Sequence, residues 1–409
     1  MRIGIGLNLL APDNGGVTNY VLTLLRHWPE FAPEHPMVLF SFAHNEPLLA
    51  TLPPESRRHE IRLQTQEEAL QHFDQIDVYF CPFGTLWPRP VRKPSVLTFH
   101  DMQERFYPEF FTPKEHAERF FHYDWSLRMA DAVIAISEFT REMAAQLVGV
   151  PRRKFRIVPH VPDALPAPEK PTDAKGLLET PFVFYPANFW RHKNHRALLE
   201  AMTLVKCQGG TINLVCTGSL LGRETEWQAA VADAGVADRV THLGKVRREE
   251  ISWLYRHAQA LVFPSLFEGF GIPLLEAMQT GCPIACGANT SQPDVAQRSA
   301  LYFEAARPDS IAAAIQRLTT DAPLRERLIN AGRARLEAFT VRRLIDGHLA
   351  AFALARRRHH RLRAWYNERI LLPRSLQPRT QLTQRESQIA AALLATRTRI
   401  PANYDRITA

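Results

Sequence analysis

Residues 264–282 read Pro-Ser-Leu-Phe-Glu-Gly-Phe-Gly-Ile-Pro-Leu-Leu-Glu-Ala-Met-Gln-Thr-Gly-Cys and decide the fold. The apolar residues just before them predict a buried strand, while Pro273 suits the start of a helix and Gly281 its end. The stretch therefore predicts a strand, a glycine-rich turn and a helix. The first N–H groups of such a helix have no partner within it and favour an anion.

Two carboxylates, Glu268 and Glu276, bracket this turn. Gly269 and Gly271 allow the backbone to approach a ligand, because no Cβ stands in the way. Glu276, near the first helical turn, can accept two hydrogen bonds from a vicinal diol such as that of a ribose. For an isolated pair of glutamates at this spacing, the alternative is an ordinary strand, turn and helix with solvated side chains.

The complete string resembles the E-x7-E segment of glycosyltransferase family 4, and the resemblance extends over residues 1–345. It implies an α/β fold of the GT-B architecture, in which two Rossmann-like domains face each other across a cleft. It also implies transfer of a hexose, of the mannose or glucose type, from a UDP- or GDP-sugar to a glycan or lipid-linked acceptor in cell-surface polysaccharide synthesis. A sugar-nucleotide epimerase or hydrolase of the same fold is the alternative.

The alternation of strands and helical stretches agrees with two α/β halves. Expected strands of the first half are 3–10, 37–43, 75–82, 95–100, 132–137 and 156–159, and those of the second half are 182–185, 212–217, 240–243, 260–264 and 283–286. Five prolines in 161–181 predict a linker. We therefore expect an acceptor domain over 1–160, a nucleotide-sugar domain over 182–340 and a helical extension over 341–409, which by the resemblance crosses back to the N-terminal domain.

Basic side chains follow the first strand of the second half, in the stretch 185–195. A cation placed there, with helix-terminal N–H groups, would stabilise the charge that develops on a leaving diphosphate. Lys193 matches the phosphate-binding lysine of the family. Many members of the family carry an additional arginine near this position; this chain lacks it, and Arg191 is the candidate to take its place.

By the same resemblance, the remaining donor contacts come from the glycine-rich turn. Gly269, Phe270, Gly271 and Ile272 would contact sugar and phosphate through their backbone groups. Glu276 would bind the ribose, and Glu268 would contact the sugar or support its developing charge. Catalysis would retain the anomeric configuration and need no metal or other cofactor.

Two motifs of the first half also lie at predicted strand ends. Gly16 follows the first strand, at the start of a helix expected over 17–28, where phosphate could bind. His100 and Asp101 follow the strand 95–100, and in the family the matching histidine contacts the transferred sugar. His100 therefore joins Glu268 and Lys193 as a catalytic candidate; a tight turn and a satisfied edge histidine are the alternatives.

Metal sites are not expected. His192 and His195 have the spacing of metal ligands, and so do Cys282 and Cys286. No carboxylate accompanies the histidines, and no second pair of Cys or His accompanies the cysteines. The odd number of cysteines, five, in mostly apolar contexts predicts reduced, buried thiols.

Composition narrows the class of protein further. A chain of 409 residues with 45% hydrophobic and 22% charged residues is globular and long enough for about two domains. No apolar run approaches the roughly 20 residues of a membrane-spanning helix, and the N-terminus enters a strand rather than a signal peptide. We therefore expect a cytoplasmic protein, with peripheral contact to the membrane as an open possibility.

The net charge of +8 comes from the C-terminus, since residues 342–409 hold 14 Arg, no Lys and 4 acidic residues. The run 356–361 predicts a solvated helix face or a contact with anionic membrane, and without accompanying motifs we expect no nucleic acid partner. Further along, Ile345, Leu349 and Phe352 share a helical stripe, Leu362 and Trp365 continue the apolar pattern, and Thr383 to Glu386 form a capping box before a short final helix.

The chain departs from the family pattern at two places. Residues 159–163, Pro-His-Val-Pro-Asp, stand where the family usually has an Asn-Gly turn at the hinge. Asp294 and Gln297 stand where Glu and Gly are usual. These changes affect the expected hinge and the rim of the site, and they leave Lys193, Glu268 and Glu276 in place.

Overall fold

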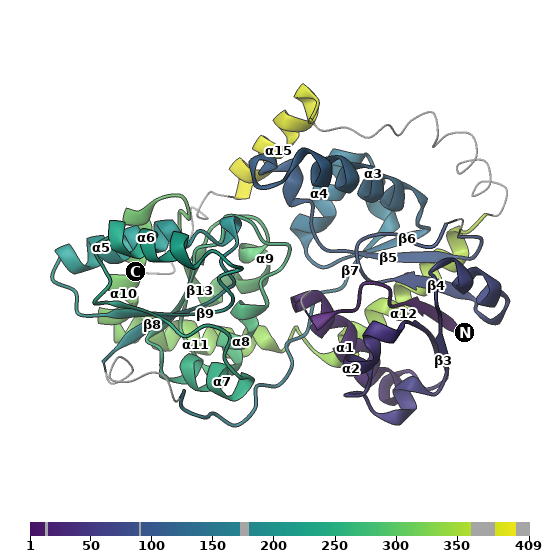
Figure 1. Cartoon of the computed structure of the whole chain (residues 1–409), viewed down its shortest axis with the longest axis horizontal. Helices are drawn as coiled ribbons and strands as arrows, with labels where there is room; N and C mark the ends of the chain where they lie inside the picture. The colour runs from purple at the N-terminus through teal and green to yellow at the C-terminus, as the bar shows by residue number, and fades with distance from the viewer. Residues whose placement is uncertain (13–14, 90, 172–179, 361–380, 398–409) are drawn as a thin grey trace. The chain divides into compact units, whose positions relative to one another are not determined.

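The computed structural model describes residues 1–12, 15–89, 91–171, 180–360 and 381–397 (Figure 1). The described residues form two compact units. Unit 1 comprises those of Met1–Asp163 and Phe339–Ala391, and unit 2 those of Ala164–Ala338 and Ala392–Ala409. Leu362 and Trp365, which the sequence places on the extension, lie outside the described residues.

Unit 1 is built on a seven-stranded parallel sheet with strand order β3-β2-β1-β4-β5-β6-β7. The order changes direction between β1 and β4, which is where open α/β sheets bind ligands at their carboxyl ends. Ile3 of β1 pairs with Met37 of β2 on one side and with Val78 of β4 on the other. The strands are β1 Ile3–Gly6, β2 Met37–Ser41, β3 Glu60–Arg62, β4 Val78–Cys81, β5 Ser95–Phe99, β6 Ala132–Ala135 and β7 Phe155–Ile157.

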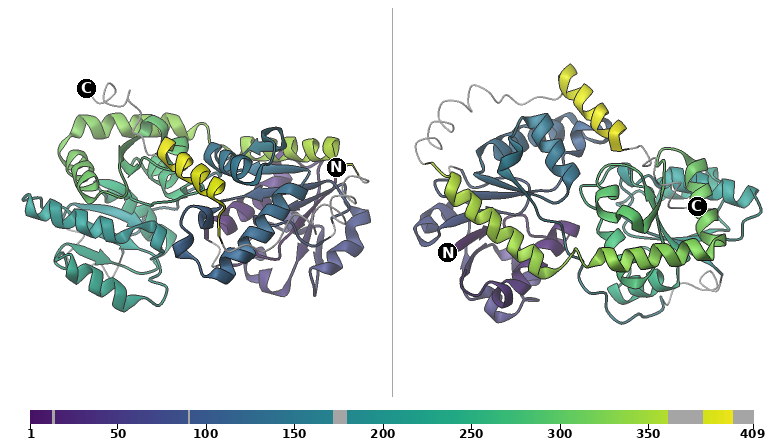
Figure 2. Two further views of the ribbon diagram at one scale, coloured as in Figure 1. Left: turned by 90° about the horizontal axis from the view of Figure 1, so that it is seen from above. Right: turned by 180° about the vertical axis from the view of Figure 1, so that it is seen from behind.

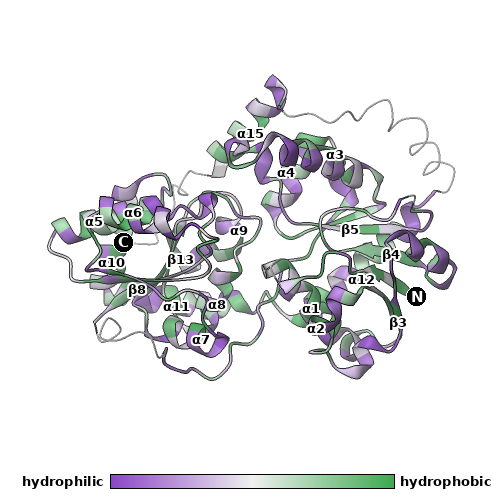
Figure 3. Cartoon of the chain, viewed as in Figure 1, coloured by the Kyte–Doolittle hydropathy of each residue, from purple (hydrophilic) through white to green (hydrophobic). Residues whose placement is uncertain are grey.

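Helices cover both faces of this sheet, and its central strands are buried. The colouring in Figure 3 shows that these strands are apolar. Figure 1 places α3 (Pro113–Met129) and α4 (Glu138–Val148) on one side, and α1 (Gly15–Phe31) and α12 (Val341–Arg358) on the other. The helix predicted over 17–28 thus begins two residues earlier and continues through Pro29 to Phe31.

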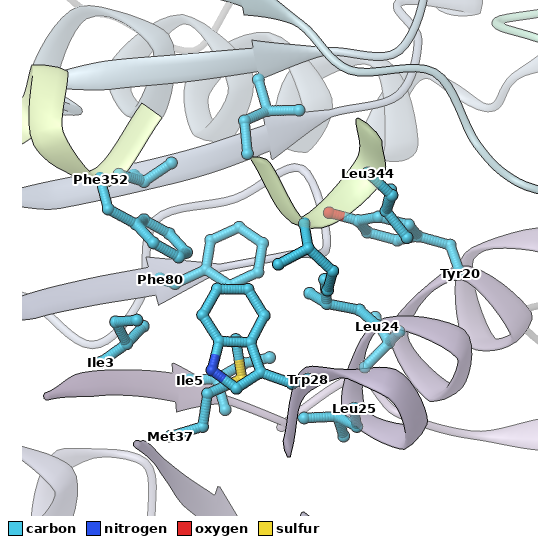
Figure 4. Packing of buried hydrophobic residues seen from close by; sticks show 14 of the residues in the cluster. Ile3, Ile5, Tyr20, Leu24, Leu25, Trp28, Met37, Phe80, Leu344 and Phe352 are labelled. Carbon is cyan, nitrogen blue, oxygen red and sulfur yellow. The ribbon is translucent and has the colours of Figure 1, made fainter. Parts of the chain in front are cut away.

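The core between α1, α12 and the sheet contains large aromatic side chains (Figure 4). Phe352 of α12 lies 5.4 Å from Phe80 of β4 and 6.0 Å from Trp28 of α1, measured between ring centroids. Gly347 allows the close packing of α12 on the end of β7, since a Cβ there would lie 2.8 Å from Val158. Figure 2 shows α12 lying across unit 1. The helix α12 is therefore part of the core of unit 1.

Unit 2 repeats the design with a six-stranded parallel sheet of order β10-β9-β8-β11-β12-β13. Its direction changes between β8 and β11. The strands are β8 Phe182–Pro186, β9 Asn213–Thr217, β10 Val240–His242, β11 Ala260–Phe263, β12 Ile284–Gly287 and β13 Ala300–Phe303. The helices are α5 His195–Cys207, α6 Glu224–Asp233, α7 Arg248–His257, α8 Ile272–Thr280, α9 Gln292–Ala296, α10 Pro308–Thr320 and α11 Ala322–Leu336.

Each of the eleven expected strands is present; most are shorter than expected or slightly shifted, and β8 extends one residue further, to Pro186. Two others were not expected, β3 and β13. β3 is a half-buried edge strand of only three residues, Glu-Ile-Arg, and carries no apolar run. β13 is apolar, but the residues before it carry no glycine or proline to mark its start. Cys207 is exposed, contrary to the expectation of buried thiols, because it ends the helix α5.

The described part of the C-terminal region is helical. At the end of α12, Arg356 and Arg357 are exposed, while Arg358 Nε donates a hydrogen bond to Asp131 O at 3.1 Å. The helix α15 (Gln384–Arg397) begins with the expected capping box, in which Glu386 N donates to Thr383 Oγ1 at 3.2 Å and Thr383 N donates to Glu386 Oε2 at 2.8 Å. No helix within the described ranges is long and apolar enough to cross a bilayer.

Candidate functional site

The glycine-rich turn of the sequence connects β11 to α8 in unit 2. Gly271 precedes the helix with φ of +102°, and Gly281 ends it with φ of +72°, both in the region that favours glycine. Pro273 occupies the first turn, as expected. The N–H groups at the start of α8 therefore lie directly after the turn that carries Glu268 and Phe270.

Polar side chains that the sequence did not single out hold this turn. Ser291 Oγ donates to Glu268 O at 2.8 Å and to Phe270 O at 3.0 Å, and Glu268 N donates to Thr290 Oγ1 at 3.2 Å. Asn289 Nδ2 donates to Leu266 O at 3.0 Å. The backbone of Thr290 has φ of +50°, a conformation that residues other than glycine rarely adopt. Residues with such rare backbone conformations are often found at functional sites. No sequence signal beyond their place after β12 pointed to these residues.

Lys193 lies after β8, the neighbour of β11 at the point where the strand order changes direction. The short 3-10 helix Arg191–Lys193 carries it, and Asn194 follows with φ of +58°. Asn194 Nδ2 donates to Ala305 O at 2.6 Å, and Tyr185 OH donates to Lys193 O at 2.6 Å. Leu266 N also donates to His192 O at 2.8 Å. The segments after β8 and β11 are thus joined by hydrogen bonds.

This junction brings Lys193 and Glu268 together. Lys193 Nζ donates to Glu268 Oε1 at 2.6 Å, and the two side chains are 18% and 12% exposed. A charged pair so far removed from water interacts more strongly than a surface pair. Two residues that the resemblance assigns to phosphate and to sugar are therefore direct partners in this structure.

Glu276 is the fifth residue of α8, one position beyond its first turn. Tyr255 OH of α7 donates to Glu276 Oε2 at 3.0 Å, and Arg248 Nη1 lies 3.8 Å from Glu276 Oε1. Burial raises the pKa of Tyr255 well above its usual value, and the charge of Glu276 adds to this. Tyr255 therefore stays a hydrogen-bond donor that orients the carboxylate, a role that the sequence did not reveal.

The basic residues around Lys193 differ in their surroundings. Arg191 is exposed and His192 is half-buried. His195 is buried against the rings of Tyr185 and Phe189, at centroid distances of 4.9 and 5.1 Å, and burial lowers its pKa to about 3. His195 is thus a neutral core residue. Across the described residues, no group of three or more His, Cys, Asp or Glu side chains could hold a metal ion.

The remaining predicted residues lie in unit 1. Gly16 is exposed in the first turn of α1; Asn14 lies outside the described residues. His100 follows β5, and a 2.6 Å hydrogen bond joins its Nε2 to Pro82 O. Its ring stacks on that of His160 at 5.7 Å, and burial lowers its pKa. His160 is one of the residues in which this chain departs from the family at the hinge.

Two family models match the chain. Residues 14–163 match the model described as Glycosyltransferase Family 4, and residues 170–335 match that described as Glycosyl transferases group 1. The chain belongs to the family 4 glycosyltransferases. Both glutamates, Lys193 and the loop around Ser291 lie within the second match.

This glycosyltransferase is 27% identical over 256 residues to O-antigen chain mannosyltransferase B of Escherichia coli, covering 60% of this chain and 66% of the relative. It is 27% identical over 216 residues to O-antigen chain mannosyltransferase RfbU of Salmonella typhimurium, covering 52% and 57%. The chain thus matches between about half and two thirds of the length of these curated relatives.

Solved structures of low sequence identity show that the glycosyltransferase has the GT-B fold. Anabaena HepE in complex with UDP and glucose superposes with a TM-score of 0.68 at 16% identity, covering 86% of this chain and 99% of HepE. Sucrose-phosphate synthase of Thermosynechococcus elongatus gives 0.67 at 21% identity, covering 87% and 99%.

Proposed function

We propose that the protein transfers a hexose, of the mannose or glucose type, from a UDP- or GDP-sugar to a glycan or lipid-linked acceptor in cell-surface polysaccharide synthesis. The observation that carries this proposal is the Lys193–Glu268 pair, held at 2.6 Å where the strand order of unit 2 changes direction. The O-antigen mannosyltransferases among the relatives support the class of product.

In this proposal, unit 2 binds the nucleotide sugar. Lys193 contacts the diphosphate, and Arg191 can extend toward it because that side chain is exposed. Gly269, Phe270, Gly271 and Ile272 meet the sugar and phosphate at the start of α8, where the positive end of the helix dipole favours an anion. Glu276, oriented by Tyr255, binds the ribose diol.

The pairing of Lys193 with Glu268 suits a reaction that creates negative charge. The carboxylate of Glu268 holds the ammonium of Lys193 in place, so that little reorganisation is needed when the diphosphate leaves. In this proposal, Glu268 in turn supports the positive charge that develops on the sugar. These two roles need no metal, and we propose a retaining, metal-independent transfer that uses His100 of unit 1 at the transferred sugar.

The test is a donor screen with product analysis. UDP- and GDP-hexoses are incubated with the purified protein and membrane glycolipid extract, in EDTA and in magnesium. Sugar transfer that persists in EDTA is expected. Epimerised donor would instead establish the epimerase alternative, release of free sugar without transfer would establish hydrolysis, and full dependence on magnesium would contradict the metal-free mechanism.

For its location, we propose the cytoplasmic side of the membrane, with Arg356 and Arg357 contacting anionic lipid. Both side chains are exposed at the end of α12, and each basic residue near such a surface contributes about 1 kcal/mol. Vesicles with anionic lipid should sediment the protein at low salt, and the double change to glutamine should weaken this. Equal sedimentation of both proteins would show that these arginines are solvent-facing only.

A further inference from the structure

A cavity of about 540 Å³ lies in unit 1 between the C-terminal half of α1, the start of β2 and the 3-10 helix Pro54–Arg57. This is the amino-terminal edge of the parallel sheet, since β2 begins at Met37. His100 follows β5 and therefore lies at the opposite, carboxyl edge. The volume is within the range of roughly 300–1,000 Å³ that is usual for small-molecule sites. The cavity is thus a candidate site of its own.

One side of the cavity is apolar and rigid. Leu25 and Trp28 of α1 and Met37 of β2, which are labelled in Figure 4, are each at most 6% exposed. They line the cavity together with an alanine and three prolines. Trp28 Nε1 donates to His35 O at 2.6 Å, which fixes the loop between α1 and β2. This side can therefore receive an apolar group with little rearrangement.

The other side of the cavity is polar. It is lined by four residues of the stretch 55–59, namely Glu55, Ser56, Arg58 and His59. No hydrogen bond or ion pair joins these four side chains to any described residue. Their neighbour Arg57, which does not line the cavity, instead donates to Glu60 Oε2 at 2.8 Å. Unused hydrogen-bonding capacity is therefore concentrated on the residues that face the cavity.

Ser56 is the buried member of this group. It is 6% exposed, and its Oγ is shielded from solvent without a hydrogen-bond partner among the described residues. Buried hydroxyl groups nearly always have a partner, and a missing one destabilises the folded state. A polar group of a ligand would supply this partner. The hydroxyl group therefore indicates where the polar end of a ligand binds.

The polar side carries charges of both signs. Glu55 supplies a carboxylate and Arg58 a guanidinium, and both side chains are exposed and accessible to a ligand. A ligand with one charge would meet one of them favourably and the other unfavourably, whereas a zwitterion matches both. An α-amino acid carries its ammonium and its carboxylate on one carbon atom, which suits two charged groups only three positions apart. Glu30 of α1 adds a second carboxylate to the lining and favours the ammonium further.

We propose that this cavity binds an amino acid with a large apolar side chain. Its carboxylate binds Ser56 and Arg58, its ammonium binds Glu55, and its side chain packs on Leu25 and Trp28. The site goes beyond the proposed function, because it lies at the edge of the sheet opposite to the one proposed for transfer. Its ligand is neither the sugar donor nor the acceptor, and both sites can be occupied together.

The probes are L-phenylalanine and L-leucine, each with the two analogues that lack either its ammonium or its carboxylate. Calorimetry measures their binding to the full chain. At least one amino acid should bind with a Kd on the order of 1 mM or tighter, and both of its analogues about tenfold more weakly or worse. Glu55→Gln and Arg58→Gln should each weaken its binding about tenfold. Arg153→Gln, at an exposed arginine of another 3-10 helix of unit 1, should leave the binding unchanged.

Ser56→Ala separates ligand binding from a role in the fold. It should weaken binding about fivefold, yet the melting temperature measured without amino acid should not fall, because the hydroxyl group has no partner to lose. A lower melting temperature would show that the hydroxyl group serves the fold and would contradict the proposal.

Titrations with UDP and GDP, with and without the amino acid, keep this proposal apart from the proposed function. The nucleotide affinity should be the same in both, and loss of nucleotide binding alone would contradict only the proposed function. The amino-acid site is wrong if neither probe binds, if an analogue binds as well as its amino acid, if the three cavity variants bind it normally, or if a nucleotide displaces it.

Discussion

At the scale of single residues, the proposed donor site is a set of side chains that already have protein partners. Lys193 holds Glu268, and Tyr255 holds Glu276. A donor molecule must therefore add to these contacts or exchange with them. This makes the effect of each substitution depend on the partner that it leaves behind.

Lys193→Ala is expected to lower turnover on the order of a hundredfold, as for other removed electrostatic stabilisers. Part of this loss would come from Glu268, which is only 12% exposed in the unchanged protein and, without its cation, would repel the diphosphate. Adding Glu268→Gln should then recover some donor affinity without recovering turnover. Lys206→Ala, at an exposed lysine paired with Asp238, is the control. Near-normal turnover of Lys193→Ala would assign the diphosphate to Arg191.

Glu276→Gln is expected to weaken donor binding at least tenfold, since an amide replaces a charge-assisted acceptor worth about 1.5–3 kcal/mol. Tyr255→Phe should cause a smaller loss, because the carboxylate remains but is no longer held at 3.0 Å by the hydroxyl group. Calorimetric titration with nucleotide sugar measures both. Equal affinity of Glu276→Gln and the unchanged protein would remove this residue from the site.

At the scale of elements, two junctions show how local conformation follows from the sequence. Gln297, between α9 and β13, has φ of +49° and ψ of −118°, a conformation that suits the glycine usual in the family at this position. Glu386, in the first turn of α15, reaches Arg105, whose guanidinium is completely buried. The backbone at Gln297 is therefore strained, whereas the start of α15 is held by the ion pair between Glu386 and Arg105.

Gln297→Gly should stabilise the protein by about 1 kcal/mol, because relief of the strained backbone outweighs the extra flexibility of glycine in the unfolded chain. The hydrogen bond from Tyr302 OH to Gln297 O can remain, since it uses the backbone. Urea unfolding followed by circular dichroism should show a higher midpoint. An unchanged or lower midpoint would mean that the surrounding structure tolerates this conformation without strain.

Glu386→Ala should release α15 from unit 1. It removes one carboxylate 3.4 Å from the buried Arg105 and also the capping box with Thr383, while Asp124 remains 2.5 Å from the guanidinium. We expect a loss of about 2 kcal/mol. Faster hydrogen exchange in 384–397 measures the release, and Gln388→Ala on an exposed position is the control. Unchanged exchange would show that apolar contacts alone hold the helix.

At the scale of the whole molecule, buried histidines couple stability to pH. His348 of α12 makes a 2.6 Å hydrogen bond with Tyr20 OH, and burial lowers its pKa to about 4. The unfolded chain takes up a proton near pH 6.5, before the folded protein does. Stability is therefore full above about pH 6.5 and falls as the pH approaches 4, by about 3 kcal/mol for this residue.

His348→Gln should make this decline shallower, since the amide can still bond to Tyr20 but does not titrate. Carboxylates titrate in both proteins and cancel in the comparison. His44→Gln, at an exposed histidine, should leave the pH profile unchanged. Melting temperatures between pH 4 and pH 7 measure the difference, and parallel profiles for the unchanged protein and His348→Gln would contradict the role of His348.

The sequence predicted the two α/β halves because buried parallel strands are continuous apolar runs, and it predicted Lys193, Glu268 and Glu276 because their motif is local. It did not predict Tyr255 or Ser291. Each of these acts through a partner that is distant in sequence, and each reads locally as an ordinary helix or loop residue. β3 was missed for a related reason, since an edge strand of three residues is defined by its neighbour β2 and not by its own composition.

Unit 1 consists of two segments of the chain that are separated by residues of unit 2, and this arrangement affects how the protein folds during synthesis. Its sheet ends at β7, but α12, which completes its core, follows only after the segment Ala164–Ala338 of unit 2. At roughly 5–20 residues per second, the ribosome needs on the order of ten to forty seconds between these two events. During this interval the apolar faces of Trp28 and Phe80 lack Phe352 and are open to chaperones. Nascent chains stalled before residue 341 should therefore bind ribosome-associated chaperones more strongly than chains stalled after residue 400.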